Sequence, residues 1–161
     1  MFKYVKDWII FFIIPLALDR ITKNIVIAAS WYDWDYCSYL GFYSTINYGV
    51  SFGWGASYNP VYQYLLWSFI ALVLIGFVSY MYALHKEGKT VLYQAALLVF
   101  SGAVSNFYDR LYWGGVIDFI SVHYGWYYFP TFNVADISIS IGIVFMLFVE
   151  WHTAYTSRVS E

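Results

Sequence analysis

The chain has 161 residues, of which 61% are hydrophobic, 25% are aromatic and only 11% carry a charge. An ordinary soluble domain is about 45–50% apolar and about 25% charged, so this composition excludes a water-soluble fold and predicts a membrane protein whose surplus apolar surface faces lipid. The net charge of −2 gives no reason to expect nucleic acid or an acidic partner. The length fits one integral membrane domain, which we predict to cover residues 1–161.

Four apolar stretches are long enough to cross a bilayer as helices, since a spanning helix needs roughly 20 residues and satisfies its own backbone hydrogen bonds. The first also has features of a secretory signal peptide, but the polar segment Asp19–Asn24 divides its apolar run, so we interpret it as a retained span. We therefore predict an all-α membrane protein with four transmembrane helices, at about residues 8–29, 61–84, 91–108 and 134–151.

The distribution of Lys and Arg indicates the orientation, because cytoplasmic connections are enriched in these residues. Five of the eight basic residues lie in the N-terminal tail, the connector at 85–90 and the C-terminal tail, which share one side of a four-span protein. We predict that both termini are cytoplasmic. The longer connections, at about 30–60 and 109–133, are then expected to face outward.

The outward connections are expected to carry structure of their own. Residues 36–54 are rich in Tyr, Phe, Thr and Gly with partial alternation, which predicts a small extracytoplasmic β-structure. Residues 111–132 carry several Tyr and Trp side chains and are predicted to lie along the membrane surface, where such rings are favoured. Cys37 is the only cysteine, so an internal disulfide is impossible and we interpret it as a spectator thiol.

Polar and ionisable residues inside a membrane are costly, and each is a candidate functional residue. In this chain they gather where the spans end on the outward side, rather than being scattered. This pattern predicts one polar site at the outer face, formed by Asp19, Arg20, Lys23, Asn47, Asn106, Asp109, Arg110, Asp118, Asn133 and Asp136.

The carboxylates of this cluster differ in their neighbours. Asp19 and Lys23 are four residues apart and are expected to pair on one helix face, and Asp109 is expected to pair with the adjacent Arg110. Asp118 and Asp136 have no basic neighbour and are flanked by apolar residues, so burial is expected to raise the carboxyl pKa. Two such groups that approach each other would share a proton, which suits acid–base hydrolysis.

Other uses of these residues remain open from the residues alone. A metal site would need more oxygen ligands than the two carboxylates, and only His123 lies near them. Serine catalysis lacks a base, because His85 and His152 fall on the cytoplasmic side. A proton-coupled transporter could use the same carboxylates as well as a two-aspartate hydrolase could. A membrane scaffold would have no need of such a cluster.

The residues of the cluster resemble the motifs of signal peptidase II, the lipoprotein signal peptidase of bacteria. Four blocks match in the order that the family has, over nearly the whole chain: LDRITK (Leu18–Lys23), NYGVSFG (Asn47–Gly53), SGAVSNFYDR followed by VIDFI (Ser101–Ile120), and FNVAD (Phe132–Asp136). Arg20, Ser51 and Ser105 depart from the residues that are frequent in the family, which are Gln, Ala and Gly.

The resemblance implies an aspartyl endopeptidase of the bacterial cytoplasmic (inner) membrane with its active site at the outer face. The expected substrate is a prolipoprotein whose cysteine carries a diacylglyceryl group, cleaved just before that cysteine among membrane lipids. No metal or organic cofactor is implied, a globomycin-type inhibitor is expected to bind, and we expect a monomer. Asp118 and Asp136 would be the catalytic pair, and site-lining or supporting roles would fall to Asn47, Gly49, Asn106, Arg110, Asn133, Asp19, Lys23 and Asp109.

Overall fold

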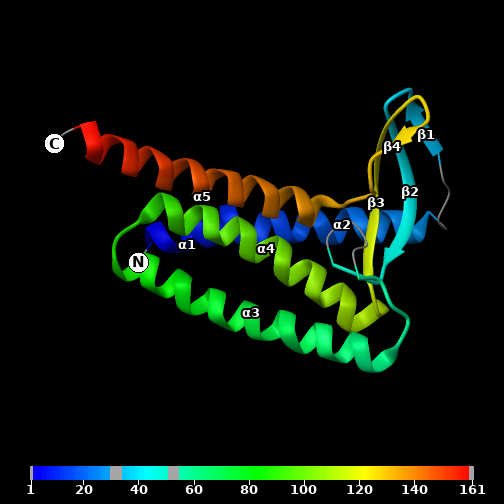
Figure 1. Cartoon of the computed structure of the whole chain (residues 1–161), viewed down its shortest axis with the longest axis horizontal. Coiled ribbons are helices and arrows are strands. Elements are labelled where there is room, and N and C mark those ends of the chain that lie inside the picture. Colours follow the sequence, from blue (N-terminus) through cyan, green and yellow to red (C-terminus); the bar gives the residue numbers. More distant parts are fainter. Residues whose placement is uncertain (1, 30–33, 51–54, 160–161) are drawn as a thin grey trace.

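The helices of this chain run side by side, and a small antiparallel sheet lies across one end of them (Figure 1). This computed structural model describes residues 2–29, 34–50 and 55–159. The elements in chain order are α1 (Phe2–Trp8), the π-helical turn η1 (Ile9–Ile13), α2 (Ile14–Ala28), β1 (Trp34–Cys37), β2 (Leu40–Asn47), α3 (Pro60–Lys86), α4 (Thr90–Trp113), β3 (Val116–Tyr124), β4 (Tyr127–Tyr128) and α5 (Val134–Val159).

Within the described residues, three helices are long and apolar enough to cross a membrane, namely α3, α4 and α5. They confirm the helices predicted at 61–84, 91–108 and 134–151, and each extends beyond its predicted bounds. The first predicted stretch is also helical, but as the three successive pieces α1, η1 and α2. Pro15 lies at the start of α2, where its ring removes a backbone donor, and the wider π-turn comes immediately before it.

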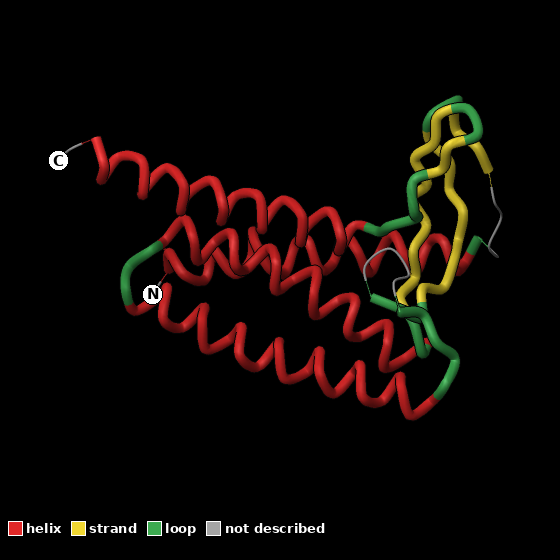
Figure 2. Tube along the Cα trace, viewed as in Figure 1, coloured by secondary structure: helices red, strands yellow, loops and turns green. Residues whose placement is uncertain are grey.

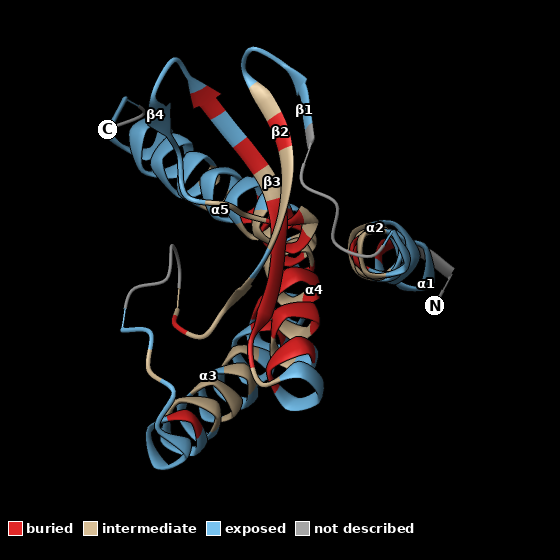
Figure 3. Cartoon of the chain, turned by 90° about the vertical axis from the view of Figure 1, so that its right-hand side faces the viewer, coloured by how far each residue is buried: buried red, intermediate tan, exposed pale blue. Residues whose placement is uncertain are grey.

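Helix α4 lies centrally, with buried residues along much of its length, and it packs against α2, α3 and α5 (Figure 3). Its contact with α5 is close because two glycines lie at the crossing. A Cβ atom on Gly102 would lie 2.3 Å from the backbone oxygen of Ala135, and one on Gly142 would lie 2.7 Å from that of Ala95. Small residues therefore bring the start of α5 against α4, as is common in membranes.

The apolar core lies toward the end of the bundle that is remote from the sheet. It is formed where the end of α3 meets the start of α4, by Met81, Leu84, Leu92, Tyr93, Ala96 and Leu97. Large apolar side chains on the outer faces of α3 and α5 are instead exposed, among them Leu65, Leu72 and Val144. Exposed apolar faces of this kind are expected of helices that contact lipid.

The sheet has the strand order β1-β2-β3-β4 with antiparallel neighbours (Figure 2). Strand β2 and the end of β1 fall in the region 36–54, where a β-structure was expected. Strand β3 was not predicted, since it lies in the segment 111–132 that we expected to follow the membrane surface. It pairs with β2 so that Thr45 lies opposite Asp118, and this pairing fixes Asp118 at the sheet–helix junction.

The start of α1 and the end of α5 lie at the end of the bundle opposite the sheet (Figure 1). The sheet end therefore holds the described parts of the connections between α2 and α3 and between α4 and α5, and the other end holds the short connector between α3 and α4. Every described residue of the predicted polar cluster maps to the sheet end.

Candidate active site

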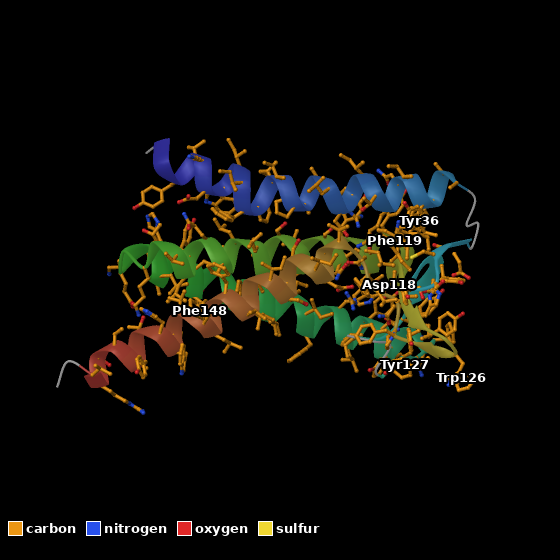
Figure 4. All side chains as sticks on the ribbon, turned by 90° about the horizontal axis from the view of Figure 1, so that it is seen from above. Tyr36, Asp118, Phe119, Trp126, Tyr127 and Phe148 are labelled. Carbon is orange, nitrogen blue, oxygen red and sulfur yellow. The ribbon has the colours of Figure 1, made fainter. Side chains whose placement is uncertain are left out.

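Asp118 lies on β3 at the end of the helix bundle, surrounded by other polar side chains (Figure 4). It is 3% exposed, so its hydrogen bonds must come from the protein. Its Oδ1 atom accepts a hydrogen bond of 2.7 Å from Nδ2 of Asn133, and its Oδ2 atom accepts one of 3.1 Å from Nδ2 of Asn47. Both asparagines were predicted members of the site, and both orient this carboxylate.

Asp136 lies in the first turn of α5 and forms a reciprocal cap with Asn133. Oδ1 of Asn133 accepts from the backbone N–H of Asp136 at 2.9 Å, and Oδ2 of Asp136 accepts from the backbone N–H of Asn133 at 3.0 Å. This is the capping-box arrangement, in which two side chains satisfy backbone donors at a helix start. The second oxygen, Oδ1 of Asp136, accepts from Nδ2 of Asn106 at 2.8 Å.

Asn106 connects Asp136 to a cation on the first helix. Its Oδ1 atom accepts from Nζ of Lys23 at 2.9 Å and from Nδ2 of Asn133 at 3.1 Å. With its oxygen held by these donors, the amide can only direct its N–H group toward Asp136. The two aspartates are thus joined through Asn133 and Asn106, although they come from a strand and a helix.

Four charged side chains pack behind this network, between α2 and α4. Nζ of Lys23 lies 2.8 Å from Asp19 and 2.7 Å from Asp109, so the predicted pairing of Asp19 with Lys23 is confirmed. The predicted pairing of Asp109 with Arg110 is wrong. Asp109 binds Arg20 and Lys23 instead, because neighbours in a helix point in directions about 100° apart, which turns Asp109 toward α2.

Arg110 points toward the sheet side of α4 and holds the segment that follows β2. Its NH2 group donates to the backbone oxygen of Gly49 at 2.9 Å, and its NH1 group donates to that of Asn106 at 3.0 Å. Gly49 also donates its N–H to Oδ1 of Asn47 at 2.9 Å. Arg110 and Asn47 therefore position this segment together, whereas Ser51 and Gly53 of the same block lie outside the described residues.

A cavity of about 240 Å³ opens beside the two aspartates. Both carboxylates line it, and so do Asn47, Asn106 and Arg110, so the cavity brings together the predicted catalytic pair and three of its eight predicted supporting residues. Asn133 binds both carboxylates, while Asp19, Lys23 and Asp109 lie behind. Sequence reasoning missed Ile139 and Ser140, which also line the cavity. Their spacing of three and four residues from Asp136, on one helix face, was the available signal.

Burial raises the pKa of Asp118 to about 7, and the nearby charge of Asp136 contributes in the same direction. Hydrogen bonds from Asn47 and Asn133 and the charge of Lys23 oppose this rise. Near neutral pH, the pair can therefore hold one proton between two carboxyl groups. Such a pair can accept a proton from water and donate one to a carbonyl oxygen.

The histidines lie elsewhere. His123 is on β3 with its Nε2 atom 3.7 Å from Asp35, on the part of the sheet away from the cavity, and His85 packs against the rings of Tyr4 and Tyr93. Within the part of the chain that the structure describes, no three side chains of His, Cys, Asp or Glu gather as a metal site would require.

Fold and site together define a membrane protein that carries paired aspartates in a cavity at one end of its helices. A family model described as signal peptidase (SPase) II matches residues 10–152. The lipoprotein signal peptidase of Aquifex aeolicus is 39% identical over 131 residues, which cover 81% of this chain and 77% of that protein. The lipoprotein signal peptidase of Syntrophus aciditrophicus is 31% identical over 148 residues, covering 88% and 92%.

The fold also matches solved structures. A bacterial membrane enzyme determined by the in meso method at 2.3 Å resolution matches with a TM-score of 0.73 and 26% identity, covering 88% of this chain and 85% of that one. A second such structure, at 1.9 Å, gives a TM-score of 0.70 and 27% identity. The chain belongs to the signal peptidase II family, and it is a membrane-embedded protease that removes signal peptides.

Proposed function

We propose that this protease acts on prolipoproteins that carry a diacylglyceryl group, and that it cleaves before the modified cysteine with Asp118 and Asp136 as its catalytic pair. The observation that carries this proposal is the joint anchoring of the two carboxylates by Asn133, beside a cavity that both of them line. The relatives named above, called lipoprotein signal peptidases, support the substrate class.

The chemistry follows from one proton shared by two carboxyl groups. The ionised carboxylate takes a proton from a water molecule as that water attacks the carbonyl carbon of the scissile peptide bond. The neutral carboxyl gives its proton to the carbonyl oxygen, which forms a neutral tetrahedral intermediate. When the C–N bond breaks, the protonated carboxyl gives its proton to the leaving amine. The other carboxylate takes a proton from a hydroxyl of the intermediate as the new carboxylic acid forms, so the pair again holds one proton.

The surroundings of the pair suit a substrate that arrives through the lipid. The cavity is lined by apolar side chains as well as carboxylates, including Ile70 and Ile139 on two different helices. In this proposal the acyl chains lie along the exposed faces of the bundle, and the extended peptide lies in the cavity beside Asp118 and Asp136. A globomycin-type cyclic peptide would compete for the same cavity.

The proposal includes an arrangement in the membrane. The piecewise helix formed by residues 2–28 acts as a fourth span beside α3, α4 and α5, and residues 1–161 form a single domain that works as a monomer. Both termini lie in the cytoplasm, and the sheet with its aspartates lies at the outer face of the bacterial inner membrane. This orientation agrees with the bias of Lys and Arg toward the end opposite the sheet.

The test is reconstitution of the purified chain in liposomes with a precursor peptide, supplied with and without a diacylglyceryl group on its cysteine. We expect cleavage of the lipid-modified precursor alone, with a new amino terminus at the modified cysteine when the products are read by mass spectrometry. Equal cleavage of both precursors would contradict the substrate assignment. Proton-linked solute flux without peptide cleavage would instead show that the protein is a proton-coupled transporter, the alternative named in the sequence analysis.

A further inference from the structure

Arg20 is a charged residue that the proposed reaction does not use, and the structure gives it two buried partners. Its NH1 group lies 2.7 Å from Oδ1 of Asp109, and its NH2 group lies 3.1 Å from Oδ2 of Asp19. Both carboxylates are 0% exposed, whereas the Arg20 side chain is 23% exposed. Its guanidinium also lies over the ring of Tyr108, with its Cζ atom 5.1 Å from the ring centroid.

All three N–H donors of Lys23 are used in this arrangement. An ammonium group has three hydrogens, and Nζ of Lys23 lies within 2.9 Å of three acceptors, which are Oδ2 of Asp19, Oδ2 of Asp109 and Oδ1 of Asn106. The last contact fixes the amide that donates to Asp136. Oδ1 of Asp109 therefore needs a different cation, and Arg20 supplies it.

We propose that Arg20 is a positioning residue for the cleavage reaction, because it balances the buried charge of Asp19 and Asp109 and so leaves Lys23 in place to orient Asn106 toward Asp136. With Arg20, two carboxylates face two cations. Without it, the same buried space would hold two carboxylates and one cation, with an excess negative charge close to the catalytic pair. This inference rests on the proposed role of Asp118 and Asp136.

Ser105 meets the same carboxylate as Arg20. Arg20 and Ser105 are the two departures from the family pattern that lie in the described chain, and both contact the same carboxylate. Oγ of Ser105 donates to Oδ2 of Asp19 at 2.6 Å, on the atom that also meets Arg20 and Lys23. Arg20 on α2 and Ser105 on α4 therefore converge on one oxygen of Asp19.

Loss of Arg20 has two predictable consequences. The excess negative charge favours the protonated forms of the catalytic pair, so the pH range of cleavage moves upward. A unit charge about 10 Å away, in a medium with an effective dielectric constant of about 20, shifts a pKa by roughly one unit. Lys23 is also drawn toward Asp109, which weakens its hold on Asn106 and lowers kcat more than it raises KM.

The titratable and charged groups around Arg20 and the catalytic pair come from several elements. Those that face Arg20 are Asp19 and Lys23 on its own helix and Tyr108 and Asp109 on α4. Tyr112 of α4 lines a second cavity, apart from the active site, together with Arg20 and Tyr108. Those that act on the catalytic pair are Lys23, Arg110 and Asp19. Arg20→Gln removes one charge and leaves every other group of this set in place.

The test compares pH profiles of kcat and KM for the wild-type enzyme, Arg20→Gln, Arg20→Lys and the double variant Arg20→Gln/Asp109→Asn, each in liposomes with the lipid-modified precursor. Gln keeps a hydrogen-bond donor near Asp109 but removes the charge. We expect the Gln variant to cleave with its profile about one pH unit higher and kcat reduced severalfold. Lys should keep the wild-type profile, and the double variant should return to it, because charge balance is restored.

Two results would overturn the proposal: an Arg20→Gln profile that coincides with that of the wild type, or a shift that is as large in Arg20→Lys or in the double variant. Thermal unfolding of each variant is measured in the same lipid. A loss of folded protein lowers the activity at every pH, whereas a change at the catalytic pair moves the pH profile. Failure of the proposed function is distinct, since the wild type would then leave the lipid-modified precursor uncleaved.

Discussion

Asn133 and Asp136 cap each other at the start of α5, each accepting a hydrogen bond from the backbone N–H of the other, at 2.9 and 3.0 Å. The same asparagine donates its side-chain amide to Asp118 at 2.7 Å. A helix cap, which in most proteins serves only stability, here sets the position of one carboxylate and orients a second. The geometry of the pair therefore depends on local folding at this one turn.

Asn133→Ala is expected to lower turnover by about 10- to 100-fold, because the catalytic pair loses a charge-assisted hydrogen bond worth about 1.5–3 kcal/mol. Loss of the cap should also cost about 1 kcal/mol of stability. Asn59→Ala is the matched control, since Asn59 caps α3 by accepting from Val61 and Tyr62 outside the cavity. Steady-state cleavage and thermal unfolding of both variants make the comparison. Equal turnover in the two would contradict the role of Asn133.

Stability should depend on pH through Asp118. Its pKa is about 7 in the folded chain against 3.8 in the unfolded one, so the folded chain retains a proton that the unfolded chain has released between these values. The free energy of unfolding therefore falls as pH rises from about 4 to about 7, by up to roughly 4 kcal/mol. Asp118→Asn should weaken this dependence, and thermal unfolding in detergent from pH 4 to pH 8 would measure it.

Glu150→Gln removes an exposed carboxylate of α5 and is the control for that experiment, since it should keep the pH dependence of the wild type. If Asp118→Asn and the wild type lost stability in parallel as pH rises, the proton would not be held at Asp118.

Gly102→Ala is expected to reduce both stability and turnover. The new Cβ would lie 2.3 Å from the backbone oxygen of Ala135, so α5 must move away from α4 and carry Asp136 with it. Such overpacking costs about 1–3 kcal/mol. Gly76→Ala lies in α3 with nothing within 4 Å of its Cβ, and it should leave turnover unchanged. Thermal unfolding and cleavage assays of both variants would test this. Wild-type turnover in Gly102→Ala would show that the contact does not position the site.

Lys23→Met and Lys89→Met should differ sharply in stability. Lys23 is 1% exposed between two carboxylates, and its removal leaves buried charge unpaired, which costs about 3–5 kcal/mol. Lys89 pairs with Glu87 on the surface, where both side chains are about half exposed and water screens the pair, so its removal should change stability little. Thermal unfolding of the two variants measures the difference. Similar losses in both would show that the buried cluster is no more important than a surface pair.

The sequence located the site well because membranes penalise polar residues. Each of the ten predicted site residues lies at the sheet end of the bundle, and the cavity is lined by both Asp118 and Asp136. Helix positions were also predicted closely, because a long apolar run in a membrane satisfies its backbone hydrogen bonds within itself by forming a helix.

What the sequence did not predict depends on contacts between distant segments. Strand β3 was missed because its partner β2 lies some seventy residues earlier, as in the pair of Thr45 with Asp118, and aromatic residues suit a membrane surface as well as a strand. The pairing of Asp109 with Arg20 and Lys23 was missed because it requires α2 to lie against α4. Sequence adjacency had suggested Arg110, which faces the other way.

Turnover of the lipid-modified precursor by Asp118→Asn and Asp136→Asn, each folded in liposomes, tests the central claim most directly. We predict that each substitution lowers kcat by about 10²–10⁴-fold, because each removes one partner of the proton exchange. The double variant should be hardly worse than either single one. Asp35→Asn, which removes a half-exposed carboxylate on β1, should keep wild-type turnover. Near-native turnover by either Asp118→Asn or Asp136→Asn would contradict the assignment of the catalytic pair.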